Sequence, residues 1–266
     1  MTEEKKTKVL FGFGSHTIRC AKKSVELMKD ADVIFIEMEE LGFHLLFSGE
    51  KSVDEIASLA FFPESLKIIL NGAMELKKKG KHIWGNEDSY DRNIWTAEEQ
   101  KRKLEIEQYL IKKMKRGGNA PTEELSKLLG EYYRIREEKI VNMLEWVIPS
   151  LVGARIYVDL GSIHTWAYEE LKRRLELKGI RIDAKYINYN GEIKPVSEII
   201  YTPLQKLQRA FRFETPEVKN PETLKKLVEE VRGYEKKANA LIKKYEDEGM
   251  AKEEAGQRAD FELMGG

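Results

Sequence analysis

Two turns of this sequence each bring a histidine to the point where a predicted strand gives way to a predicted helix. His16 follows a Gly-Ser pair and precedes a threonine, and His164 lies in a second such turn with one extra residue, Ile163, before it. A neutral imidazole can bind a metal ion or act as a general base near neutral pH. Because the chain has only four histidines, two of them in equivalent turns predict one shared site. Capping or packing roles for both rings are the alternative.

Two carboxylates end the strand that follows the first of these turns. Glu37 and Glu39 close an apolar run, and alternation along a strand points both of them to the same side of the sheet. If that strand lies parallel to the first one, Glu37 ends near His16. A carboxylate beside an imidazole can bind a metal, orient the ring or act as a base. The alternative is a solvated strand end, in which Glu39 or Glu40 caps the next helix.

A long helix carries two charged residues on or beside its own apolar stripe. Arg136 and Glu137 fall among the positions of Tyr133 and Ile140, where apolar side chains are expected. Buried charges are costly unless they are paired. We therefore expect both residues to face a polar site at the sheet edge, with Arg136 binding an anion or a carboxylate. A salt bridge between them or at the rim is the alternative. Residues 86–88 follow another strand and are further candidates.

The elements that position these residues form a β-α-β pattern that occurs twice. Residues 8–39 and 154–188 share the order of strand, Gly-Ser, His-Thr, amphipathic helix and strand. Such a unit implies two parallel strands joined by a helical crossover. Ligands of open α/β sheets bind at the carboxyl edge of the strands, so both histidines are expected at one edge. The predicted strands cover residues 8–14, 32–39, 81–84, 154–160 and 181–188.

Further helices are predicted outside the repeated units. A charged helix over 96–116, a Gly-Gly-Asn-Ala-Pro break and a second helix that ends at about Val147, before a proline, indicate a helical hairpin. Helices are also predicted over 195–213 and 221–248. The residues from about 249 onward are expected to be loosely ordered.

The sequence therefore predicts an α/β fold with a mostly parallel central sheet flanked by helices. The α/β core domain would cover residues 7–190 and would contain the helical hairpin as an insertion at about 96–148. A C-terminal helical extension would cover residues 195–266.

Composition and charge argue against several classes of protein. The 46 basic and 46 acidic residues cancel to a net charge of zero, which disfavours a nucleic-acid binder. No apolar run approaches the ~20 residues that span a bilayer, and no secretory signal is visible. We therefore expect a cytoplasmic protein without a membrane partner. The single cysteine, Cys20, allows no internal disulfide or cysteine metal cage and is expected to be buried. Abundant Lys and Glu are typical of heat-adapted, thermophilic proteins.

The order of these motifs resembles that of the TraB/PrgY/Tiki superfamily, with its relatives ChaN and the erythromycin esterases. The segments that carry the resemblance are GFGSHT, VIFIEMEE, RIREEKIVNML and VDLGSIHTWAYEELKRRLELKGIRI, and they span about residues 8–190. The resemblance implies a ChaN-like α/β fold with a helical insertion. It also implies a site formed by His16, Glu37, Arg136, Glu137 and His164. Tiki-like members are metal-dependent proteases, and the esterase relatives use His and Glu to activate water.

Two main functions remain open from the sequence. The first is a metal-dependent hydrolase of a peptide or a small ester, in which His16, Glu37 and His164 bind Mn, Co or Zn or activate the water. Arg136 would then stabilise developing negative charge. The second is a non-catalytic binding protein that uses its charged helices for a partner or for self-association as a homo-oligomer. Haem binding, as in some ChaN-like relatives, is a third hypothesis that no residue specifies.

Overall fold

The structure is a computed structural model in which two compact units are distinguished. It describes residues 6–14, 16–38, 40–58, 60, 62–85, 101–102, 105–106 and 122–264. Unit 1 comprises residues 1–90 and 137–199, and unit 2 comprises residues 91–136 and 200–266. The region of the predicted insertion therefore contributes to both units.

Unit 1 is built on a six-stranded sheet in the order β3-β2-β4-β1-β5-β6. Every neighbouring pair is parallel except β5 with β6. The mostly parallel α/β sheet predicted from the sequence is confirmed, and all five predicted strands are present with ends shifted by up to three residues. The strands are β1 Lys8–Gly14, β2 Val33–Ile36, β3 His82–Gly85, β4 Arg155–Gly161, β5 Arg181–Ile187 and β6 Ile193–Lys194.

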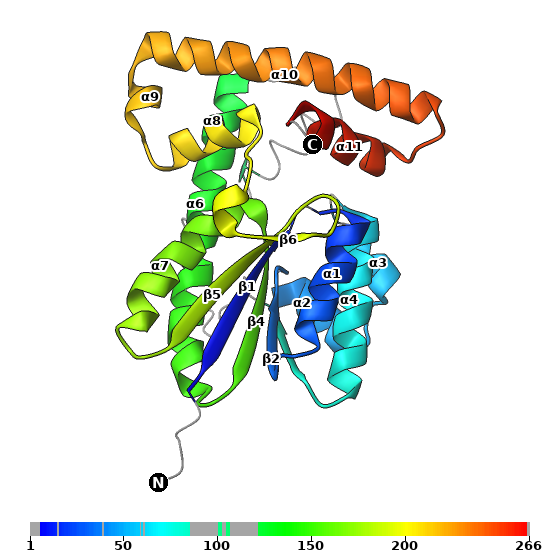
Figure 1. The fold of residues 1–266 in the computed structure, drawn as a ribbon, viewed down its shortest axis with the longest axis vertical. Helices are drawn as coiled ribbons and strands as arrows, with labels where there is room; N and C mark the ends of the chain where they lie inside the picture. The colour runs from blue at the N-terminus through cyan, green and yellow to red at the C-terminus, as the bar shows by residue number, and fades with distance from the viewer. Residues whose placement is uncertain are drawn as a thin grey trace. The chain divides into compact units, whose positions relative to one another are not determined.

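Helices cover both faces of this sheet (Figure 1). One face packs against α1, α2, α3 and α4. The other face packs against α7 and the part of α6 that begins at Glu137. The bounds are α1 Ile18–Met28, α2 Glu40–Phe47, α3 Val53–Ala57, α4 Pro63–Lys78, α6 Thr122–Val147 and α7 Thr165–Glu176, with short 3-10 turns at Ile148–Ser150, Ser162–His164 and Val196–Glu198.

Alternation along β1 explains how this strand serves both faces. Val9, Phe11 and Phe13 are buried in the core beneath α6 and α7. On the opposite face Gly12 has no side chain, and the hydroxyl of Tyr157 from β4 fills that space. A Cβ atom on Gly12 would lie 1.8 Å from the Tyr157 hydroxyl oxygen, so the close approach of this tyrosine requires glycine.

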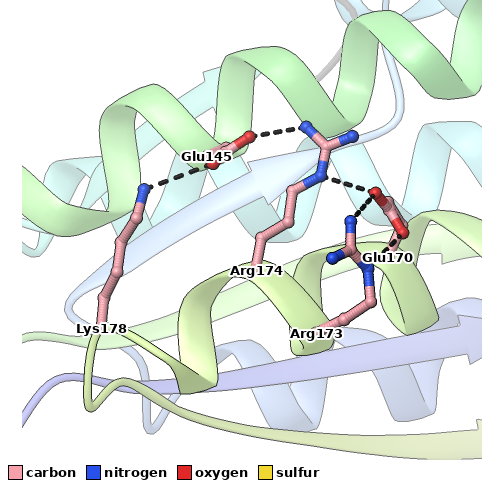
Figure 2. Close-up of polar contacts among 5 residues, drawn as sticks. All are labelled: Glu145, Glu170, Arg173, Arg174 and Lys178. Atoms are coloured by element: carbon pink, nitrogen blue, oxygen red, sulfur yellow. Dashed lines mark hydrogen bonds and ion pairs between the residues drawn. The ribbon is translucent and has the colours of Figure 1, made fainter.

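Ion pairs link α7 to α6, the two helices that cover the same face of the sheet (Figure 2). The guanidinium of Arg174 lies 2.6 Å from Glu145 of α6 and 2.7 Å from Glu170 of its own helix. Lys178 adds a contact of 3.3 Å to Glu145, and Arg173 adds one of 2.7 Å to Glu170. Arg174 thus joins α7 to α6. Glu137 belongs to α6, and His164 directly precedes α7.

Unit 2 is helical in its described residues. Leu207 of α8 packs against Val228 and Val231 of α10, and α11 packs against Tyr245 of α10 through Ala255. The prediction of loosely ordered residues from about 249 was wrong for the segment that forms α11. The bounds are α8 Pro203–Arg212, α9 Pro216–Lys219, α10 Pro221–Asp247 and α11 Lys252–Leu263. Among the helices of the described residues, none combines the length and the hydrophobicity that a bilayer span requires.

Candidate functional site

The two histidine turns leave adjacent strands at the same level. β1 and β4 are parallel neighbours, and Gly14 is paired in register with Gly161. After the first turn, Thr17 caps α1 because its hydroxyl accepts a hydrogen bond of 3.0 Å from the Cys20 amide. The repeated β-α-β pattern therefore places both histidine turns at one carboxyl edge of the sheet.

Glu37 joins β2 to the second of these turns. Its Oε2 atom accepts a hydrogen bond of 2.6 Å from the amide of Gly161, and its Oε1 atom lies 3.2 Å from Nε2 of His164. Because β4 lies between β1 and β2 in the sheet, Glu37 reaches the end of β4 directly. Its exposed fraction is 15%, so this carboxylate remains accessible.

Glu137 approaches the same imidazole from the other side. Its Oε1 atom lies 3.2 Å from Nδ1 of His164, and the two side chains are 0% and 1% exposed. A neutral imidazole donates from one nitrogen and accepts at the other, whereas an imidazolium donates from both. When Nδ1 donates to Glu137, Nε2 of a neutral ring accepts from a protonated Glu37, and Nε2 of an imidazolium donates to an ionised Glu37. This chain of carboxylate, imidazole and carboxylate fixes the ring and can move a proton.

His16 lies against the same backbone turn. Its ring stacks on Phe62 with 4.8 Å between the ring centroids. A Cβ atom on Gly161 would lie 3.0 Å from Nε2 of His16 and 3.3 Å from Oε2 of Glu37. The side chains of His16 and Glu37 therefore both approach Gly161, and any larger residue at this position would crowd them. The structure thus brings together four of the predicted site residues. They are His16, Glu37, Glu137 and His164.

The remaining candidates from the sequence are Arg136, Glu39 and residues 86–88. Arg136 belongs to unit 2, where its guanidinium carbon lies 5.3 Å from the ring centroid of Tyr132, and its role at the site stays a prediction. Glu39 and residues 86–88 lie outside the part of the chain that the structure describes. Cys20 is buried in α1, as predicted.

Sequence reasoning missed a hydrogen-bonded group at the end of β4. The hydroxyl of Ser24 from α1 donates to the carboxylate of Asp159 and lies 2.7 Å from the hydroxyl of Tyr157. The sequence carried a signal, because Asp159 is an acidic residue among the apolar residues that follow Arg155 in this strand. Its register partner on β1 is Gly12, the residue that leaves room for Tyr157.

The surroundings of Asp159 change its titration. The pKa of this carboxyl is raised from 3.8 to about 7, and burial is the largest cause. The negative charge of Glu37 also raises this pKa, whereas hydrogen bonds with Ser24 and Tyr157 lower it. Burial and the Asp159 charge also raise the pKa of Tyr157. Asp159 and Glu37 are therefore two carboxyl groups whose charges affect each other.

Glu37 and Asp159 line one pocket at the carboxyl edge of the sheet. α1 and α4 form its walls, and the ends of three strands form its base. Carboxylates, an imidazole and hydroxyl groups thus share this pocket with apolar side chains. Its lining consists of Gly14, His16, Thr17, Cys20, Ala21, Ser24, Glu37, Ser65, Leu66, Ile69, Asp159, Leu160 and Gly161.

The suitability of the site for a metal ion can be judged from its donor groups. Within the described residues, no three His, Cys, Asp or Glu side chains form an arrangement that could hold a metal ion as they stand. By donor type, two imidazoles and a carboxylate suit a transition metal. Glu137 behind His164 is the kind of carboxylate that orients a metal-binding histidine.

Comparisons of this chain with protein-family models, with curated proteins and with solved structures found no match.

Proposed function

We propose that this protein is a hydrolase of a peptide or a small ester. The observation that carries the proposal is the position of the His164 ring between Glu137 and Glu37, with a contact of 3.2 Å on each side. A buried carboxylate that orients an imidazole beside a second, accessible carboxylate is an arrangement suited to general acid–base catalysis.

Each side chain has a distinct part in the proposed reaction. Glu37 takes a proton from water, whose oxygen attacks the carbonyl carbon of the substrate, and gives this proton to the leaving group as the bond to it breaks. His164 holds the carboxylate of Glu37 in position. Glu137 holds the ring of His164 in position. The role of stabilising the negative charge that develops on the carbonyl oxygen is the one that the sequence predicts for Arg136. His16, stacked on Phe62, would contact the water or the substrate.

A divalent cation is part of the proposal. His16, Glu37 and His164 are the residues that would hold Mn, Co or Zn. When bound, such an ion polarises a carbonyl and lowers the pKa of water. The support is the donor set and the position of Glu137 at the second nitrogen of His164.

We also propose that the chain belongs with the TraB/PrgY/Tiki superfamily and shares a ChaN-like fold with an inserted helical hairpin. The support is the order of the sequence motifs along a mostly parallel sheet. The hairpin gains support from Arg102, whose guanidinium donates two hydrogen bonds of 2.9 Å to Glu131 of α6. Residues of the predicted first arm and α6 therefore contact each other.

Metal analysis together with an activity screen tests the proposal. Protein purified after exposure to Mn, Co or Zn should retain one of these ions, and the double variant His16→Ala, His164→Ala should lose it. Retention of the ion by this variant, or no bound ion under any condition, would overturn the metal assignment. Hydrolysis without metal would keep the acid–base assignment, whereas failure to cleave any peptide or ester would remove the hydrolase proposal.

A binding or interaction protein is the second candidate function. Three large apolar side chains of unit 1 are strongly exposed: Trp146 at 72%, Val152 at 77% and Leu177 at 85%. Exposed apolar side chains favour contact with a partner when they gather in a patch. Light scattering tests self-association, and substitution of Trp146 by Lys should dissociate an assembly that uses this residue. A monomer unaffected by the substitution would count against self-association there.

A further inference from the structure

The pocket beside His16 combines apolar walls with an acidic base. Ala21, Leu66 and Ile69 contribute aliphatic surface, while Glu37 and Asp159 contribute carboxyl groups. Among the described lining residues the basic group is the imidazole of His16, and no lysine or arginine is present. Such a pocket suits a group with a short apolar stem and a positively charged or hydrogen-donating end.

The carboxylate of Asp159 is held in place by the fold. Ser24 of α1 donates a hydrogen bond to it, and Tyr157 of the same strand lies 2.7 Å from the Ser24 hydroxyl. Gly12 on the neighbouring strand makes room for Tyr157. A group that is already oriented loses less conformational freedom when a ligand binds, so this arrangement favours recognition by Asp159.

Two charged carboxyl groups in one partly buried pocket repel each other, and a bound cation would offset this repulsion. Both carboxyl groups line the pocket beside apolar side chains, and a cation and a carboxylate attract each other more strongly there than in bulk water. The aliphatic wall residues can pack against the alkyl stem of an organic ammonium, because such a stem can replace water along that surface.

We propose that this pocket is a subsite for a primary ammonium group on a short apolar stem, and that Asp159 is the residue that selects it. Its role as a substrate subsite rests on the proposed hydrolase function. The substrates would be peptides or esters that carry a lysine-like side chain or a free amino terminus near the bond to be cleaved.

Ligand titration followed by NMR tests this inference without any turnover. The probes are n-butylammonium, which imitates a lysine side chain, and alaninamide, which imitates an amino terminus. Butanol and butyrate are the neutral and anionic controls. At pH 8, n-butylammonium or alaninamide should shift the amide signals of Thr17, Ser24 and Gly161. The cation that binds more tightly identifies the source of the ammonium group.

Variants separate recognition by Asp159 from general effects on the protein. Asp159→Asn should weaken binding of the cation by ~10-fold or more, because a charge-assisted hydrogen bond is lost. Asp183→Asn, on exposed β5 surface, is the matched control and should bind as the unmodified protein does. Leu66→Lys places an ammonium group at the pocket wall and should abolish binding even if Asp159→Asn does not fold.

The results can contradict this inference separately from the proposed function. Equal binding of butanol or butyrate, no shift of the pocket amides, or unchanged cation binding by both Asp159→Asn and Leu66→Lys would overturn the ammonium subsite. Hydrolysis by the protein could still be found in that case. Conversely, charge-selective binding in a protein that cleaves nothing would keep the binding site and remove its role in hydrolysis.

Discussion

The Nδ1 atom of His164 lies 3.2 Å from Oε1 of Glu137, and neither side chain is more than 1% exposed. Two polar groups in such a position depend on each other, because water cannot replace either partner. This contact also joins α6 to the turn after β4. It therefore connects the stability of unit 1 with the orientation of the ring that faces Glu37.

Removing the imidazole should destabilise the fold. We predict that His164→Ala lowers the free energy of unfolding by about 2–4 kcal/mol, because the buried Glu137 loses a hydrogen-bond partner and a cavity remains. Chemical denaturation measures this change. The matched control is His44→Ala at an exposed position of α2, which should stay within ~0.5 kcal/mol of the parent. Equal effects of the two substitutions would show that the contact with Glu137 has no stabilising role.

The close approach of Tyr157 to β1 predicts the effect of a single methyl group. Gly12→Ala would place a Cβ atom 1.8 Å from the Tyr157 hydroxyl, so the tyrosine must move away from Ser24. We expect a loss of about 1–3 kcal/mol from overpacking, measured by denaturation. Gly233→Ala in α10, where nothing lies within 4 Å of the added Cβ, should instead stabilise by about 0.5–1 kcal/mol. A stabilising Gly12→Ala would contradict the packing described here.

The raised pKa of Asp159 predicts how stability depends on pH. The folded protein holds this proton up to a pH of about 7, whereas the unfolded chain releases it near 3.8. Between these values the folded state binds more protons, so the contribution of Asp159 to stability falls as pH rises. Asp159→Asn should remove this part of the decline. Denaturation curves across this range measure it, with Asp183→Asn as the control. Parallel pH profiles for the parent and Asp159→Asn would be the contrary result.

Arg174 should contribute more than Arg173 to the packing of α7 on α6. Arg174 contacts Glu145 across the two helices, whereas Arg173 pairs with Glu170 on its own helix (Figure 2). A double-mutant cycle of Arg174→Ala with Glu145→Ala should give a coupling of about 0.5–1 kcal/mol. The corresponding cycle for Arg173 and Glu170 should give a smaller coupling, because water screens this exposed pair within one helix. A larger coupling for Arg173 would reverse this assignment.

The sequence predicted much of the sheet and part of the site. Strong apolar runs marked the strands, and a charged residue on an apolar stripe marked Glu137. The contact of Glu37 with Gly161 was not predictable, because it depends on β4 lying between β1 and β2. Strand order is a property of the whole sheet and leaves no local signal.

Two other features were missed for different reasons. Asp159 belongs to the face of β4 that packs on α1, and its role appears only when Ser24 is placed opposite it. Helix α11 was missed because the two residues that it buries against Tyr245 of α10 are small. They are Ala255 and Ala259. Their hydrophobic periodicity is weak, and packing on α10 provides what local hydrophobicity does not.

The most direct measurement of the central claim is the hydrolysis rate of the Glu37→Gln variant. Against the peptide or ester that the unmodified protein cleaves best, with and without Mn, Co or Zn, we predict a fall in kcat/KM of ~100-fold or more, because the amide cannot take a proton from water. Glu169→Gln, at an exposed position of α7, should keep the parent rate. An unchanged rate for Glu37→Gln in a folded protein would contradict hydrolysis at this site.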